Sequence, residues 1–161
     1  MKAKRRGAKW LVLAASGSCY LAALPCPALL FTLDPPVRGI TTLLWGWWGL
    51  VTGDFPWLAN PMYFVALLLV ALSSNKMALL LCAVAIGIGA RSLLVEQWYF
   101  NEAQGTPVTG LGLAFYLWMA SFVVLFLGAI ILQWLCKPLK TESGPQPPPT
   151  LKCLQAENGQ C

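Results

Sequence analysis

The chain has 161 residues, of which 58% are hydrophobic and only 11% are charged. About a quarter of the residues in an average soluble domain are charged. A water-soluble fold of this size could not cover so much apolar surface with polar side chains, so the composition argues against that class. Lipid removes the requirement, and we therefore expect an all-α membrane protein.

The net charge is +5, and the basic residues cluster at the two ends of the chain. Those before the first apolar run are Lys2, Lys4, Arg5, Arg6 and Lys9, and those after the last are Lys137, Lys140 and Lys152. A nucleic-acid-binding domain would spread such charge over a polar face. Basic segments that flank apolar runs are instead typical of cytoplasmic loops, so we expect both termini in the cytoplasm and no nucleic-acid partner.

The first apolar run covers residues 10–33, after a basic cytoplasmic segment of residues 1–9. It is long enough to cross the hydrocarbon layer, and Pro25 and Pro27 should kink or loosen its outer end. A cleaved leader ending near Cys19 is the alternative interpretation. Because the apolar run continues well past Cys19, an uncleaved anchor is favoured.

The segment of residues 40–58 holds four of the eight tryptophans. Its apolar part, residues 40–52, is too short to span a bilayer. Tryptophan favours the headgroup level, so we expect an interfacial or re-entrant helix on the outer surface. The alternative is a fifth span. Four spans leave only Arg38 and Arg91 outside, with nine of the eleven cations in the cytoplasm, which the positive-inside rule favours.

Three further spans follow, at about residues 59–75, 77–95 and 110–136. Asn60 and Pro61 resemble the N-cap and first residue of the second span. The second and third spans should form a hairpin with a minimal cytoplasmic turn. Residues 137–161 are proline-rich and predict a disordered cytoplasmic tail, which is either simply solvated or docks a partner through its prolines. The predicted fold is a four-helix transmembrane bundle.

Small residues recur at helical spacing in the last two spans. The pairs are Ala83 with Gly87 and Ala85 with Gly89 in the third span, and Ala114, Ser121 and Gly128 in the fourth. Small side chains let helices approach closely in lipid. They predict packing within one bundle, with self-association through the same stripe as the alternative.

Arg91, Asp54, Trp45 and Trp48 are the candidate contacts to a ligand or partner. Arg91 is the one cation inside an apolar run and could bind an anionic group, or it could reach the interface and meet Glu96 or Glu102. Asp54 could hold a cation or partner, or it could cap a turn.

Several activities lack the residues that they need. The chain has no histidine, no Cys-x-x-Cys pair and no acidic residue or lysine at the centre of a span. Metal-dependent proteolysis, disulfide generation and proton-coupled transport therefore have no support. We expect no enzyme activity, cofactor or metal, and no catalytic residue is assigned.

Two stretches resemble small bacterial inner-membrane proteins with four predicted transmembrane helices. They are Trp57-Leu58-Ala59-Asn60-Pro61 at the entry to the second span and TGLGLAFYLWMAS over residues 109–121. The resemblance implies a bacterial cytoplasmic membrane. No activity is established for those proteins, so it implies no functional residue.

Two functional hypotheses remain. The first is a non-enzymatic accessory, regulatory or immunity-type subunit that contacts lipid and another membrane protein, or a second copy of itself. The second is a protein that binds or transports a lipid or another small hydrophobic molecule, using the outer tryptophans and Arg91.

Overall fold

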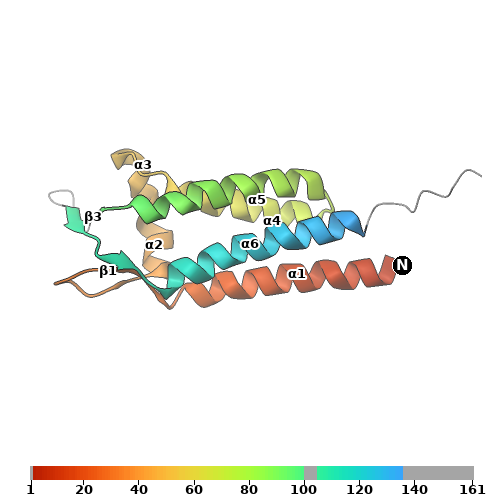
Figure 1. The fold of residues 1–161 in the computed structure, drawn as a ribbon, viewed down its shortest axis with the longest axis horizontal. Helices are drawn as coiled ribbons and strands as arrows, with labels where there is room; N and C mark the ends of the chain where they lie inside the picture. Colours follow the sequence, from red (N-terminus) through yellow and green to blue (C-terminus); the bar gives the residue numbers. More distant parts are fainter. Residues whose placement is uncertain (1, 100–104, 136–161) are drawn as a thin grey trace, which may run out of the picture.

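A computed structural model describes residues 2–99 and 105–135, and it is mostly helical. Four helices lie side by side along its long axis: α1 (Lys2–Ala23), α4 (Ala59–Ala71), α5 (Asn75–Ala90) and α6 (Leu113–Trp134) (Figure 1). Helix α6 packs along α1 and α5, and α5 packs along α4. The N-terminus, the α4–α5 turn and the end of α6 lie at one end of the bundle, which we name the basic end.

Side chains of all four helices meet in one apolar core. Its largest fully buried members include Tyr63 of α4 and Phe122 and Leu125 of α6. Helices α1 and α6 are in close contact at Gly128, where an added Cβ would collide with the side chain of Val12. Glycine therefore leaves room at this crossing for the Val12 side chain, as small residues do between helices in lipid.

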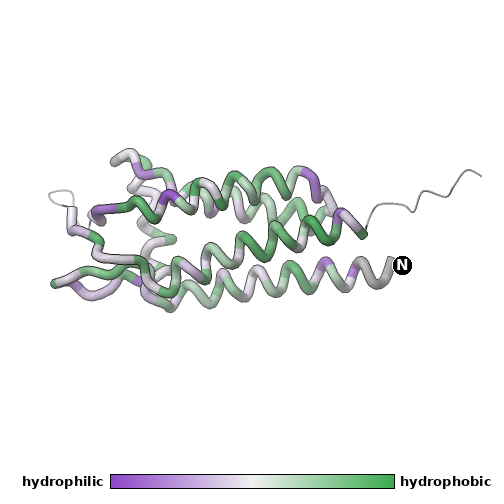
Figure 2. The backbone as a smooth tube through the Cα atoms, viewed as in Figure 1, coloured by the Kyte–Doolittle hydropathy of each residue, from purple (hydrophilic) through white to green (hydrophobic). Residues whose placement is uncertain are grey.

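Two helical stretches in the described part of the chain, Asn75–Leu94 and Leu113–Trp134, are long and apolar enough to cross a membrane. Only 22% and 33% of their most apolar windows are buried inside the protein. Their outer faces therefore expose apolar side chains along their length, and polar residues gather toward the ends of the molecule (Figure 2). A third apolar helical stretch, Pro56–Ala71, is shorter.

Short helices lie beyond the N-terminal end of α4, at the end of the bundle opposite the basic end. They are α2 (Gly39–Trp45), η1 (Gly46–Trp48), α3 (Gly49–Thr52) and η2 (Pro56–Leu58). Helix α4 has 13 residues and so is about 20 Å long, whereas α6 has 22 residues. The short helices cross the bundle in the space that α4 leaves (Figure 1). We name residues 39–58 the tryptophan segment and this end of the molecule the tryptophan end.

Two small antiparallel sheets complete the tryptophan end. One has the order β2 (Val37–Arg38), β1 (Pro27–Leu30) and β5 (Gly110–Leu111), and the other pairs β3 (Gln97–Tyr99) with β4 (Gly105–Pro107). Leu29 lies opposite Leu111, and the Thr109 hydroxyl donates to the Leu30 carbonyl at 2.9 Å. This pairing joins the residues that follow α1 to those that precede α6.

The structure differs from the sequence prediction at several element boundaries. The predicted span of residues 10–33 is a helix that ends at Ala23 and a strand over Pro27–Leu30. Pro25 and Pro27 end the helix instead of kinking it, because proline cannot donate the next helical hydrogen bond. The helix also reaches back through the basic segment to Lys2.

The later boundaries differ less. The predicted surface helix of residues 40–52 is three short helices, and the predicted spans 59–75 and 77–95 correspond to α4 and to α5 with η3 (Arg91–Leu94). The predicted span 110–136 begins as strand β5 before α6. The predicted tail, residues 137–161, lies outside the described residues.

Candidate functional site

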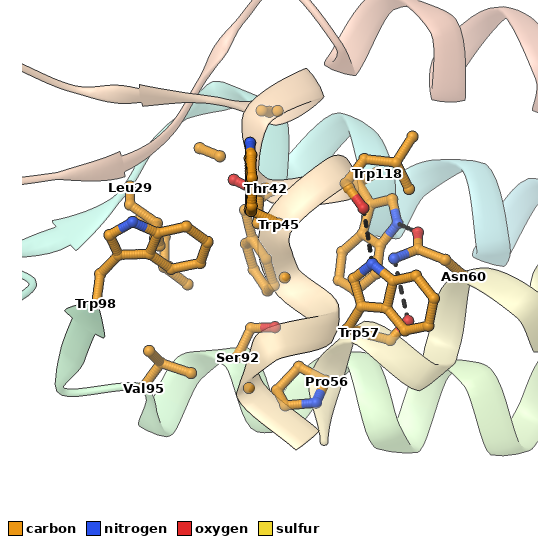
Figure 3. Close-up of a pocket in the computed structure, with 18 of the residues that line it drawn as sticks. Leu29, Thr42, Trp45, Pro56, Trp57, Asn60, Ser92, Val95, Trp98 and Trp118 are labelled. Carbon is orange, nitrogen blue, oxygen red and sulfur yellow. Dashed lines mark hydrogen bonds between the residues drawn. The ribbon is translucent and has the colours of Figure 1, made fainter. Parts of the chain in front are cut away.

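A cavity of about 150 Å³ lies between the tryptophan segment, the ends of α1, α4 and α6, and the residues that follow α5. Figure 3 shows its wall, with Trp98 and Leu29 on one side, Trp57, Trp118 and Asn60 on the other, and Trp45 between them. The aromatic residues that line it are Tyr20, Trp45, Trp48, Trp57, Trp98, Tyr99, Phe115 and Trp118. Its surface is mainly apolar, as is usual for sites that bind small hydrophobic molecules.

Glycines let the tryptophan segment lie close against its neighbours. A Cβ on Gly46 would lie 2.8 Å from Cδ1 of Trp57, and one on Gly39 would collide with the Ala23 carbonyl. The indole N–H of Trp57 also donates to the Leu43 carbonyl at 2.8 Å, which joins η2 to α2. These close contacts fix the segment over the end of the bundle, and the cavity is the space that it does not fill.

Asn60 is the polar centre of the cavity wall. Its Oδ1 accepts from the Tyr20 hydroxyl and from the Trp118 indole N–H, both at 2.8 Å, and its Nδ2 donates to the Trp57 carbonyl at 3.1 Å. Two donors on one oxygen determine which way the amide points. The bonds connect α1, α4 and α6, so this one side chain positions three walls of the cavity. The prediction that Asn60 caps the second span is wrong, since α4 already begins at Ala59.

A second polar contact lies one helical turn deeper. Ser16 donates to the Ser121 carbonyl at 2.8 Å, and the hydroxyl groups of Ser16 and Tyr63 are 2.8 Å apart. Serine has one proton, so Tyr63 donates to Ser16. The rings of Tyr20 and Tyr63 stack with centroids 5.0 Å apart. Pairing of this kind is what buried polar groups between apolar helices require.

The cavity wall is suited to non-covalent binding. Asp54 is the one carboxylate among the described residues of the wall. It is exposed, and its backbone N–H donates to the Gly49 carbonyl at 2.7 Å in the turn after α3. In the part of the wall that the structure describes, neither lysine nor arginine lines the cavity, and no serine or cysteine lies beside a general base. A nucleophile would need such a base for covalent catalysis.

The structure brings together three of the four residues that the sequence singled out for ligand or partner contact. Trp45, Trp48 and Asp54 all line the cavity. Arg91, in η3, is exposed and does not line it, so the wall lacks the cation that the sequence analysis had assigned to a binding role.

The small residues divide between two faces of the helices. Ala114, Ser121 and Gly128 are buried on α6, and Ala85 and Gly89 are buried on α5, with Gly89 beside Trp118 and Met119. Ala83 and Gly87 are exposed, and a Cβ on Gly87 would meet nothing within 4 Å. Positions two apart on a helix point about 200° apart, so only one of the two pairs on α5 can face the bundle. We expected Ala83 and Gly87 to pack against another helix of the bundle, and in the structure they do not.

The sequence did not lead us to predict a role in positioning the cavity for Ser16, Tyr20 or Tyr63, and it led us to assign other roles to Asn60 and Ser121. The signal was present, because polar side chains repeat at helical spacing inside apolar runs. The pairs are Ser16 with Tyr20, Asn60 with Tyr63, and Trp118 with Ser121. Polar groups at such depth need partners, and here each pair finds them on the neighbouring helices.

No known protein family, curated protein or solved structure matches this chain. What its geometry defines is a mostly helical protein with two helices able to cross a membrane and an aromatic cavity at one end. The function is therefore inferred from that cavity and from the distribution of charge around it.

Proposed function

We propose that the chain is a multi-pass membrane protein that binds a lipid or another small hydrophobic molecule in the aromatic cavity, without chemical conversion. The observation that carries the proposal is the cavity itself, which is enclosed mainly by aromatic and aliphatic side chains. An apolar cavity of about 150 Å³ in another protein stays dry and binds benzene, so a space of this size can hold an apolar ring or the end of an acyl chain.

In this proposal the four bundle helices are the spans of a bacterial inner membrane, with both termini in the cytoplasm. Arg6, Lys9 and Lys76 lie toward the basic end, whereas Asp34, Asp54 and Glu96 belong to the connections at the tryptophan end (Figure 1). The positive-inside rule then puts the basic end in the cytoplasm. Helix α1 is less apolar than α5 or α6, and the hydroxyl groups of its Ser16 and Tyr20 are paired inside the bundle.

This orientation puts the cavity at the outer membrane–water boundary. The indole rings of the tryptophan segment favour that level, because their bodies are apolar and their N–H groups can stay hydrated. Trp45 and Trp48 are 62% and 37% exposed, so the cavity wall is accessible from the surface of the protein. A hydrophobic molecule in the outer leaflet could then enter without crossing the membrane.

Adjacent threonines on α2 supply a matched test. Thr42 lines the cavity and Thr41 does not. The purified protein in lipid nanodiscs should bind 1-ethyl-4-fluorobenzene saturably, seen as a bound ¹⁹F NMR resonance. Thr42→Phe should abolish that resonance by filling the space, and Thr41→Phe should keep it. Saturable binding that survives both substitutions equally would rule out this cavity as the site.

A second candidate function is that of an accessory, regulatory or immunity-type subunit. The observation in its favour is the exposed Ala83–Gly87 face of α5, where a second helix could approach closely. Gly87→Leu should then abolish recovery of a stoichiometric membrane partner. Gly17→Leu on α1, where an added Cβ also meets nothing within 4 Å, is the control. Unchanged recovery with Gly87→Leu would count against this function.

A further inference from the structure

The hydrogen-bonding capacity of Asn60 is only partly used within the protein. Both lone pairs of its Oδ1 are engaged, by the Tyr20 hydroxyl and by the Trp118 indole N–H. Its Nδ2 carries two N–H groups, and the described residues provide an acceptor for one of them, the Trp57 carbonyl. Asn60 is 7% exposed and lines the cavity. It therefore presents a spare donor at a buried position, where an unpaired donor is costly.

Two indole N–H groups of the wall are further donors. The described residues provide no acceptor for the indole N–H of Trp45 or Trp98, which both line the cavity. Acceptors line the cavity too, namely the side-chain oxygens of Thr42, Ser92, Gln97 and Tyr99. Trp45 is 62% exposed, so water can accept from its N–H. Asp54 is exposed, so its carboxylate is hydrated. The donor that is nearly buried is the second N–H of Asn60, and a ligand that brings an acceptor would complement it.

We propose that the cavity selects uncharged apolar molecules that carry a carbonyl oxygen, and that the spare N–H of Asn60 donates to that oxygen. The inference rests on the proposed function and narrows its ligand class. A carbonyl of this kind occurs in ketones and quinones with an apolar ring, and in the acyl esters of lipids. An anionic ligand does not fit, because no lysine or arginine among the described residues lines the cavity.

A pair of ligands of nearly equal shape tests the role of the oxygen. The probes are 4-fluoroacetophenone and 1-ethyl-4-fluorobenzene, titrated into the protein in lipid nanodiscs and followed by ¹⁹F NMR. One additional hydrogen bond corresponds to a preference of about fivefold for the ketone. A second pair, methyl hexanoate and heptane, is titrated as competitors of the bound probe. If methyl hexanoate is preferred over heptane by a larger factor than the ketone is preferred over the ethyl compound, the ligand is a lipid ester. If the ketone is preferred by the larger factor, the ligand is a free molecule with an apolar ring.

Asn60→Asp removes both N–H donors and keeps an oxygen for Tyr20 and Trp118. It should remove the preference for the ketone while the hydrocarbon still binds. The control is the same substitution at Asn75, which is also buried but lies at the basic end (Figure 1). Asn75→Asp should keep the preference. If Asn60→Asp does not fold, the comparison of the two ligands on the unaltered protein still decides the inference.

The outcomes separate this inference from the function on which it rests. Saturable binding of both ring probes with equal affinity would overturn the role of the carbonyl and leave the hydrophobic cavity as a binding site. Absence of saturable binding for every probe would overturn the proposed function itself. A ketone preference that survives Asn60→Asp would overturn the assignment to Asn60.

Discussion

Gly128 offers the most direct test of how α1 and α6 pack. A Cβ at this position would collide with Val12, so Gly128→Ala overfills the contact. Overpacking of this kind lowers the free energy of unfolding by about 1–3 kcal/mol. Alanine stabilises the interior of a helix by about 1 kcal/mol relative to glycine, which offsets part of that loss. We therefore expect Gly128→Ala to lower the free energy of unfolding by about 1 kcal/mol.

Two companion variants make this prediction specific. Gly87→Ala introduces the same methyl group where nothing lies within 4 Å, so it should raise stability by up to about 1 kcal/mol. Val12→Ala removes the methyl groups that the new Cβ would meet. The double variant Val12→Ala with Gly128→Ala should then be more stable than the sum of the single effects, by about 1 kcal/mol.

The assay is reversible unfolding of the purified protein in mixed micelles of mild detergent and dodecyl sulfate, followed by tryptophan emission. The described chain has Trp118 near the α5–α6 contact, so loss of packing changes its surroundings. Equal stabilities for Gly128→Ala and Gly87→Ala would refute the reasoning. Strict additivity in the double variant would show that Val12 and Gly128 are not in contact.

Three further predictions use the same unfolding assay. Asn60→Leu should cost about 3 kcal/mol, because it leaves the Tyr20 hydroxyl and the Trp118 indole N–H without their acceptor; a loss below about 1 kcal/mol would contradict the buried network. Ser73→Gly should raise stability by about 1 kcal/mol, because Ser73 has φ 67°, a backbone conformation that glycine adopts without strain; a decrease would count against this turn geometry. Lys9→Met should cost less than about 1 kcal/mol, because the Lys9 ammonium donates to the Ala71 carbonyl at the C-terminal end of α4; a larger loss would mean that Lys9 does more than cap that helix.

The long apolar runs could be located from the sequence, but the faces of their helices could not. In a helix that is apolar all round, periodicity does not distinguish the side that faces lipid from the side that faces protein. Small and polar residues do carry that information. Ala85 and Ala83 nevertheless look alike in the sequence, and only the packing of α5 against α6 shows which of them is buried.

The tryptophan end was harder to predict because its contacts join distant parts of the chain. The pairing of Leu29 with Leu111 connects residues 82 positions apart, and neither strand has an alternating pattern long enough to recognise. Asn60 was interpreted as a cap because asparagine favours the N-cap position and the proline that follows it favours the first position of a helix. Pro56 begins the short helix η2 ahead of α4, so Asn60 lies inside helical structure and its side chain reaches other helices.

The central claim is that the aromatic cavity holds a hydrophobic molecule. Native mass spectrometry of the protein released from its own membrane tests it directly, with Thr42→Phe and Thr41→Phe measured beside the unaltered chain. The account predicts one bound small molecule on the unaltered protein and on Thr41→Phe, and its loss from Thr42→Phe. The same bound species at the same occupancy on all three proteins would contradict it.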